Sequence, residues 1–216
     1  MSSKDLFSYK GKIIKGIIFD LDGTLYSQPK MHAYMLLKLF LYYIIRPQKL
    51  YELRVIYFFR KKRYESIGCN DLEHSQYKVT SDYLKIPIEE VRRIISFWIQ
   101  EKPLKCIKNC RYSYIPHLFK QFRLMNMKIA VVSDYPIEEK LKALELIADV
   151  MVCSTDKDVN SFKPDPKGFI VASEKMDVLP ENCIVIGDRD DKDGEGARLA
   201  GMSFVKNNKN NKYIFE

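Results

Sequence analysis

Short apolar runs alternate with helical stretches along most of this 216-residue chain, and this alternation constrains the fold more than any other feature. Runs rich in β-branched residues predict five strands, the last of them at an edge, at residues 12–20, 128–133, 150–153, 183–186 and 203–205. Helices are expected between and after them, at residues 115–126, 136–147, from about 166 onward and at about 194–200. Because parallel strands need right-handed crossover connections, the sequence predicts an α/β fold with a doubly wound, mainly parallel sheet.

Residues 30–105 interrupt the alternation, because they contain helical patterns but no convincing strand. Four helices are expected there, at residues 31–45, 48–62, 71–84 and 88–100. This segment reads as a helical insertion, which leaves residues 1–29 and 106–216 to form the α/β core. Because the insertion begins just after two closely spaced acids, we expect it to lie over the site that these acids form.

The positive charge of the chain is concentrated in the same insertion. The whole chain carries a formal charge of +8, and residues 30–105 hold 15 Lys/Arg against 8 Asp/Glu. Residues 51–63 are apolar and aromatic first and end in the basic run RKKR. This stretch has three interpretations: a helix with cations at its carboxyl end, a rim that attracts an anionic substrate, or a surface that contacts an anionic membrane. No nucleic-acid-binding module is recognisable, so we expect no nucleic acid partner.

The composition is that of an ordinary globular protein of the cell interior. Five cysteines are scattered without the even framework of a secreted disulfide-rich domain, and the first dozen residues lack the apolar core of a secretory signal. The most apolar stretch, residues 31–45, is shorter than a membrane span and contains Lys38. We therefore expect a cytoplasmic protein.

Polar side chains follow several of the expected strands at the point where each strand ends. Asp20 and Asp22 end the first strand, Ser133 ends the second, and Asp188 follows the strand at 183–186. Lys163 lies in SFKPDP, just before an expected helix. Since the carboxyl ends of parallel strands meet at one edge of the sheet, these side chains should converge there.

This set of side chains suits the transfer of a phosphoryl group. Several carboxylates would repel a phosphate ester unless a divalent cation bridged them, which predicts Mg²⁺ held by Asp20 and Asp188. Lys163 and the Ser133 hydroxyl can bind the remaining phosphate oxygens. One carboxylate can attack phosphorus to give an aspartyl-phosphate, and the other can protonate the leaving alcohol and later activate water.

Four motifs, in this order, resemble those of the haloacid dehalogenase-like (HAD) hydrolase superfamily. They are DLDGT at residues 20–24, Ser133, Lys163 in FKPDP, and GDRDDKDG at 187–194. The resemblance implies a Rossmann-like core. It also implies that the insertion is similar to the helical caps of the phosphoglycolate phosphatase and β-phosphoglucomutase branches, which close over the site.

The resemblance also implies a role for each matching residue. Asp20 would be the nucleophile and Asp22 the general acid and base. Mg²⁺ would be held by the Asp20 carboxylate, the Asp22 backbone carbonyl and Asp188. The phosphate binders would be Thr24, Ser133 and Lys163. Asp193 would be the supporting acid, with Asp191 as the alternative because the acidic run leaves the register ambiguous.

The second acid distinguishes activities within the superfamily, since dehalogenases lack an acid two residues after the nucleophile. The presence of Asp22 therefore indicates a Mg²⁺-dependent phosphatase, which hydrolyses a small phosphorylated metabolite through an aspartyl-phosphate. A phosphomutase would share every motif and is one alternative. The other is a noncatalytic protein of the same fold that uses its basic cap to dock on a partner or a membrane.

Overall fold

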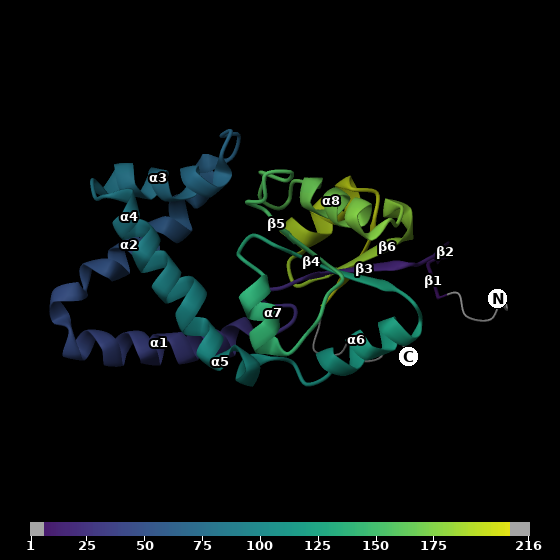
Figure 1. Ribbon diagram of the computed structural model, residues 1–216, viewed down its shortest axis with the longest axis horizontal. Coiled ribbons are helices and arrows are strands. Elements are labelled where there is room, and N and C mark those ends of the chain that lie inside the picture. The colour runs from purple at the N-terminus through teal and green to yellow at the C-terminus, as the bar shows by residue number, and fades with distance from the viewer. Residues whose placement is uncertain (1–6, 208–216) are drawn as a thin grey trace. The chain divides into compact units, whose positions relative to one another are not determined.

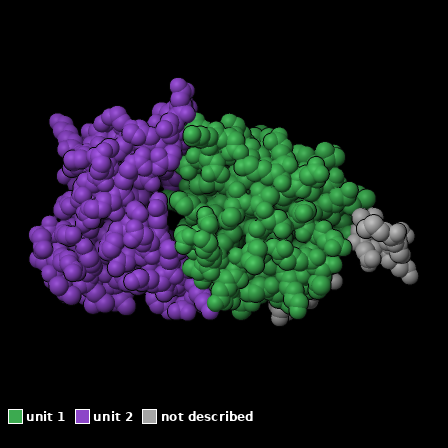
Figure 2. Space-filling view, in the orientation of Figure 1, with its two compact units in different colours: residues 1–27, 111–216 green, residues 28–110 purple. Residues whose placement is uncertain are grey.

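The computed structural model describes residues 7–207, which divide into two compact units (Figure 2). The sheet unit comprises the chain up to Ser27 and from Arg111 onward, and the helical unit comprises residues 28–110. The expected insertion ran from 30 to 105. The helical unit is slightly longer at both ends because its first helix begins at Gln28 and its last helix ends at Cys110.

A five-stranded parallel sheet forms the centre of the sheet unit, as expected (Figure 1). Its order is β5-β4-β3-β6-β7, and every neighbouring pair is parallel. The strands are β3 (Gly16–Asp20), β4 (Lys128–Ser133), β5 (Val150–Cys153), β6 (Cys183–Gly187) and β7 (Ser203–Lys206). The expected edge position of the last strand is confirmed, because β7 pairs only with β6 in this sheet.

The single strand expected at residues 12–20 is wrong, because the chain uses this stretch for two separate strands. Lys12–Ile13 forms β2, which pairs with β1 (Ser8–Tyr9) in an antiparallel hairpin, and Gly16 starts β3. The hairpin turns at Lys10 and Gly11, both with positive φ. Glycine at such a position makes the tight turn possible.

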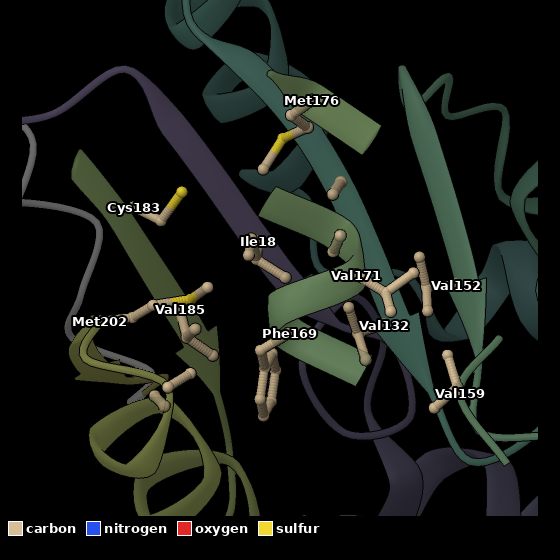
Figure 3. Close-up of a cluster of buried hydrophobic side chains, with 14 residues drawn as sticks. Ile18, Val132, Val152, Val159, Phe169, Val171, Met176, Cys183, Val185 and Met202 are labelled. Atoms are coloured by element: carbon tan, nitrogen blue, oxygen red, sulfur yellow. The ribbon is translucent and has the colours of Figure 1, made fainter. Parts of the chain in front are cut away.

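Helices pack against the sheet from both of its faces. The helices of this unit are α6 (Ile115–Leu124), α7 (Glu138–Leu144), α8 (Lys167–Met176) and α9 (Glu195–Leu199). Successive residues of β3 serve opposite faces, as in any strand. Ile18 belongs to the buried cluster that contains Phe169 of α8 (Figure 3), whereas the Phe19 ring stacks on Phe119 of α6 at 4.8 Å. This alternation produces the doubly wound sandwich.

The helical unit contains five α-helices among the described residues. They are α1 (Gln28–Ile45), α2 (Tyr51–Lys62), α3 (Leu72–Leu84), α4 (Ile88–Ile95) and α5 (Lys102–Cys110), with a π-helical segment, Ser96–Glu101, between the last two. The sequence did not predict α5, because Pro103 resembles a helix end. The helical conformation nevertheless continues without a break from Ile88 to Cys110, and Pro103 lies just after the π-helical segment. None of the helices within residues 7–207 has the length and apolar character required to cross a membrane.

A buried carboxylate connects the elements of the helical unit. Glu52 of α2 is 1% exposed and accepts hydrogen bonds from the Tyr43 hydroxyl (3.1 Å), Trp98 Nε1 (3.0 Å) and the Arg93 guanidinium (2.9 Å). These donors come from α1, the π-helical segment and α4. Because an unpaired carboxylate is costly to bury, the three donors and Glu52 fix the packing of these elements on one another.

Candidate active site

Strand register brings three of the expected site residues to one edge of the sheet. Asp20, the last residue of β3, lies opposite Val132 of β4, and Ser133 is the next residue of that strand. Phe19 lies opposite Ile186 of β6, so Asp188 begins the loop just beyond the same edge. This edge holds the carboxyl ends of the strands, where open α/β sheets bind ligands.

Lys163 connects two of the acids at this edge. Its Nζ lies 2.5 Å from Asp20 Oδ1, 2.7 Å from Asp193 Oδ1 and 3.2 Å from the Val132 carbonyl oxygen. Lys163 is 5% exposed and Asp20 is 7% exposed, so water screens the pair little. The electrostatic attraction between this ammonium and an anion bound beside Asp20 would therefore be weakened little by water.

Three carboxylates gather around this ammonium. Asp20, Asp188 and Asp193 each offer one oxygen, and these oxygens lie within 4.8 Å of one another. A π-helical turn, Asp190–Gly194, carries Asp193 back toward the strand end, where its Oδ2 accepts a hydrogen bond from the Arg189 N–H at 3.2 Å. Asp193 thus joins the cluster, whereas Asp191 is exposed and pairs with the Arg189 side chain at 2.5 Å.

Two glycines allow the acids to approach the strand ends closely. Gly23 has a φ of +104°, a conformation that other residues rarely adopt, and a Cβ at this position would clash with the Asp188 carboxylate. A Cβ on Gly187 would likewise clash with Asp193. The glycines of DLDGT and of GDRDDKDG are therefore part of how the cluster is built.

The cluster has more negative than positive charge. Burial, with a smaller contribution from Asp193, raises the pKa of Asp20 to about 8 despite the lowering effect of Lys163. Burial, followed by Asp193, also raises the pKa of Asp188. Burial alone would lower the pKa of Lys163, but Asp20, Asp193 and Asp134 together raise it above its ordinary value, so the ammonium keeps its proton.

A divalent cation fits this donor set. The donors are all carboxylate oxygens, which hard cations such as Mg²⁺ prefer. Asp20 Oδ2 is buried and has no hydrogen-bond partner within residues 7–207. Added positive charge would satisfy this oxygen and offset the repulsion among Asp20, Asp188 and Asp193, so the residues present fit a metal ion.

Asp22 has different partners from Asp20. Its carboxylate accepts hydrogen bonds from Lys140 Nζ at 2.7 and 3.0 Å and from the Tyr26 hydroxyl. Lys140 lies on α7 and is 6% exposed, although lysine is rarely buried unless paired. Sequence reasoning missed Lys140, because in the run EEKLK it looks no different from the exposed Lys142.

The two hydroxyl residues of the expected set are both buried. Ser133 Oγ accepts a hydrogen bond from the Tyr135 N–H at 3.1 Å, so its own hydrogen is available to another acceptor. Thr24 Oγ1 has no hydrogen-bond partner in the described part of the chain. Asp134, which the sequence reading also passed over, accepts from Ser154 Oγ at 2.6 Å and thereby holds the loop after β4.

A family model and a curated relative both match this chain. The family model described as haloacid dehalogenase-like hydrolase matches residues 14–201. The chain is 36% identical to glyceraldehyde 3-phosphate phosphatase of Methanopyrus kandleri over 98 residues, which are 43% of this chain. This match spans only 40% of that curated relative.

Solved structures share the architecture. A 2-haloacid dehalogenase from Pseudomonas syringae superposes with a TM-score of 0.62 at 18% identity, covering 90% of this chain and 86% of that one. A predicted phosphoglycolate phosphatase from Haemophilus somnus gives a TM-score of 0.54 at 18% identity, covering 89% and 84%. At these identities the likeness concerns the fold, and the two names show that one fold hosts different chemistries.

Proposed function

The chain belongs to the haloacid dehalogenase-like hydrolase family, and from this we propose that it is a Mg²⁺-dependent phosphatase. Its substrate is a phosphate monoester of a small metabolite, and its intermediate is an aspartyl-phosphate. The Asp20 carboxylate carries this proposal, because one oxygen pairs with Lys163 at 2.5 Å while the other is buried without a hydrogen-bond partner in residues 7–207. A carboxylate held in this way suits nucleophilic attack.

Asp20 attacks phosphorus with one of its carboxylate oxygens. A carboxylate–phosphorus bond forms as the bond from phosphorus to the ester oxygen breaks. Lys163 Nζ, which already contacts Asp20, offsets the charge on the phosphoryl oxygens, and the hydroxyls of Ser133 and Thr24 donate hydrogen bonds to them. Buried donors of this kind act more strongly than donors in water.

Asp22 moves the protons. It gives a proton to the leaving alkoxide in the first step, and as a carboxylate it takes a proton from the water that attacks the aspartyl-phosphate in the second. Inorganic phosphate then leaves and Asp20 is regenerated. The separate contacts of Asp22 with Lys140 and Tyr26 support this division of roles, since they keep Asp22 apart from the Asp20–Lys163 pair.

Mg²⁺ would be held by the Asp20 carboxylate, the Asp22 backbone carbonyl and Asp188, with Asp193 as the supporting acid. A bound Mg²⁺ would neutralise negative charge on the phosphate ester and so permit attack by an anion. The carboxylate cluster supports this assignment, as does the Asp193–Lys163 contact of 2.7 Å.

The helical unit serves as the cap that excludes water and selects the substrate. Its support is its position in the chain, since residues 28–110 lie between the DLDGT motif and every other site residue. The relative that acts on glyceraldehyde 3-phosphate supports a small phosphorylated metabolite as substrate. A phosphomutase would use the same residues and differ in the acceptor of the phosphoryl group.

Phosphate release from a panel of phosphorylated metabolites tests the proposal. With Mg²⁺ present, we expect the wild type to release phosphate from some members. Asp20→Asn should lower turnover at least about 10³-fold, because it removes the nucleophile. Asp191→Asn, which changes an exposed acid of the same motif, is the matched control and should keep full turnover. An active Asp20→Asn, or a wild type that releases no phosphate, would overturn the phosphatase proposal.

A further inference from the structure

One side of α1 presents large apolar side chains to solvent. Six of them are between 51% and 72% exposed: Leu36, Leu37, Phe40, Leu41, Ile44 and Ile45. Side chains spaced three, four, seven and eight residues apart lie on the same side of a helix. We call this set the α1 face.

The opposite side of α1 packs within the helical unit. Met31 and Tyr43 are buried, and the Tyr42 ring meets Trp98 edge-on at 4.9 Å. The helix is therefore apolar on both sides, whereas a surface helix normally has one polar side. A contiguous exposed apolar face of this kind marks a site of interaction with a protein or a membrane.

The charge around the α1 face indicates which partner it meets. Residues 23–51 contain no Asp or Glu, and they carry Lys30, Lys38, Arg46 and Lys49. The whole helical unit, residues 28–110, holds 16 Lys/Arg against 8 Asp/Glu, whereas the rest of the chain holds 20 of each. A second copy of this chain fits poorly, because a two-fold contact through α1 would bring these cations together without an acid to pair them.

We propose that the α1 face docks on the surface of an anionic phospholipid bilayer. The apolar side chains enter the boundary between headgroups and acyl chains, and Lys30, Lys38, Arg46 and Lys49 contact the lipid phosphates. An exposed apolar helix face gains from entering the membrane interface, and cations beside it are attracted to the anionic headgroups. The docking is peripheral, because α1 lies in the interface and does not cross the bilayer.

The structure favours the α1 face as the docking surface over the basic run at residues 60–63, which the sequence indicated. Arg63 is 1% exposed, and Lys62 pairs with Glu65 at 3.0 Å. Of the four cations of the run, only Arg60 and Lys61 are exposed. The run therefore offers a smaller positive surface than its sequence indicates, and α1 offers the larger apolar one.

Cosedimentation with vesicles tests the proposal on the full chain. The probes are vesicles of phosphatidylcholine alone and of phosphatidylcholine mixed with phosphatidylserine. We expect the wild type to pellet with the anionic vesicles and to be released by high salt, because salt screens the electrostatic attraction. Two triple variants should lower binding at least about 10-fold. They are Leu37→Gln/Phe40→Gln/Ile44→Gln and Lys38→Gln/Arg46→Gln/Lys49→Gln.

Matched controls separate the α1 face from general surface properties. They make the same kinds of change at exposed positions of the sheet unit: Leu124→Gln/Ile147→Gln/Leu199→Gln and Lys120→Gln/Lys128→Gln/Lys157→Gln. Both should pellet like the wild type, and circular dichroism should show that all four variants are folded. Equal losses in controls and α1 variants would overturn the proposal. So would a wild type that stays in the supernatant, that binds neutral vesicles equally well, or that forms a dimer abolished by the α1 changes.

Discussion

Asp20 and Asp22 are two residues apart, yet each carboxylate contacts its own lysine. Lys163 contacts Asp20 at 2.5 Å, and Lys140 contacts Asp22 at 2.7 Å. Each of the two acids therefore has a cation beside it, which offsets part of the repulsion between two closely spaced carboxyl groups. Separate partners also allow one acid to act as nucleophile while the other handles protons.

We expect Lys140→Met to impair turnover through Asp22. In the proposed mechanism Lys140 positions Asp22, so its loss should free Asp22 to leave the orientation from which it donates a proton. Turnover of an alkyl phosphate, whose leaving group needs that proton, should fall at least about 10-fold, a fraction of the roughly 10²–10⁴ that general acid–base catalysis contributes. Turnover of p-nitrophenyl phosphate should fall much less, because p-nitrophenolate leaves without a proton.

The ratio of the two rates is the decisive readout for Lys140, since general damage to the site would lower both rates together. Lys142→Met is the matched control. This exposed lysine of the same helix pairs only with Glu138 and Glu139 among the ion pairs of the described chain. An unchanged ratio in Lys140→Met would show that Lys140 does not act through Asp22.

Sequence reasoning found the residues at strand ends and missed residues that reach the site from helices. Asp20, Ser133 and Asp188 follow from where short apolar runs stop, because parallel strands end at one edge. Lys140 does not, because which lysine of EEKLK is buried depends on how α7 rotates against the sheet. Whether Asp191 or Asp193 joins the carboxylate cluster likewise depends on a π-helical turn, which no residue pattern predicts.

At the scale of elements, the helical unit depends on the buried Glu52. We expect Glu52→Ala to lower its free energy of unfolding by about 2–4 kcal/mol, because Tyr43 and Trp98 lose this buried acceptor and Arg93 keeps only its contact with Glu90. Glu73→Ala is the control. It breaks an ion pair with Arg92 that is exposed, with side chains 36% and 48% accessible, and such pairs contribute about 0–1 kcal/mol. Urea denaturation measures both values, and similar values would contradict a structural role for Glu52.

Element boundaries were harder to predict than element types. Most helices and strands of the sheet unit begin and end close to the expected residues, since their apolar periodicity is strong. The strand expected at 12–20 is wrong because its first two residues, Lys12 and Ile13, form the second strand of a hairpin that turns at Lys10 and Gly11. Helix α5 was missed because a proline usually ends a helix, whereas here the helical conformation continues through Pro103 after a π-helical segment.

At the scale of the whole molecule, we expect Mg²⁺ to stabilise the chain against unfolding. A ligand that binds only the folded state adds about 2.7 kcal/mol at a concentration roughly 100 times its Kd. Asp188→Asn should lose this effect, because it removes a donor of the carboxylate cluster, whereas Asp191→Asn should keep it. Thermal unfolding with and without Mg²⁺ measures the shift. Equal shifts in the two variants would contradict the assignment of Asp188 as a ligand.

The same stabilisation should depend on pH. Burial raises the pKa of Asp20 to about 8, so below this pH protons compete with Mg²⁺ for its carboxylate. Raising the pH removes the competing proton. The Mg²⁺-induced shift should therefore grow as the pH rises through about 8, and a shift that shrinks over this range would be inconsistent with binding at Asp20.

The fold alone does not determine which reaction is catalysed, because structures named as a dehalogenase and as a phosphatase share it. What favours a phosphatase is the second acid, Asp22, together with the lysine that holds it. The proposal depends most on which residue attacks phosphorus. This attack leaves a covalently bound phosphoryl group on the attacking side chain.

That phosphoryl group is best sought in the variant Asp22→Asn mixed with p-nitrophenyl phosphate. The aryl leaving group departs without a proton, but the amide that replaces the Asp22 carboxylate cannot activate water, so the aspartyl-phosphate should accumulate. Peptide mass spectrometry of the acid-quenched protein then locates the phosphoryl group. We expect it on Asp20, with a burst of p-nitrophenolate equal to the amount of enzyme. A phosphoryl group on another side chain, or none at all in a variant that releases p-nitrophenolate, would contradict nucleophilic catalysis by Asp20.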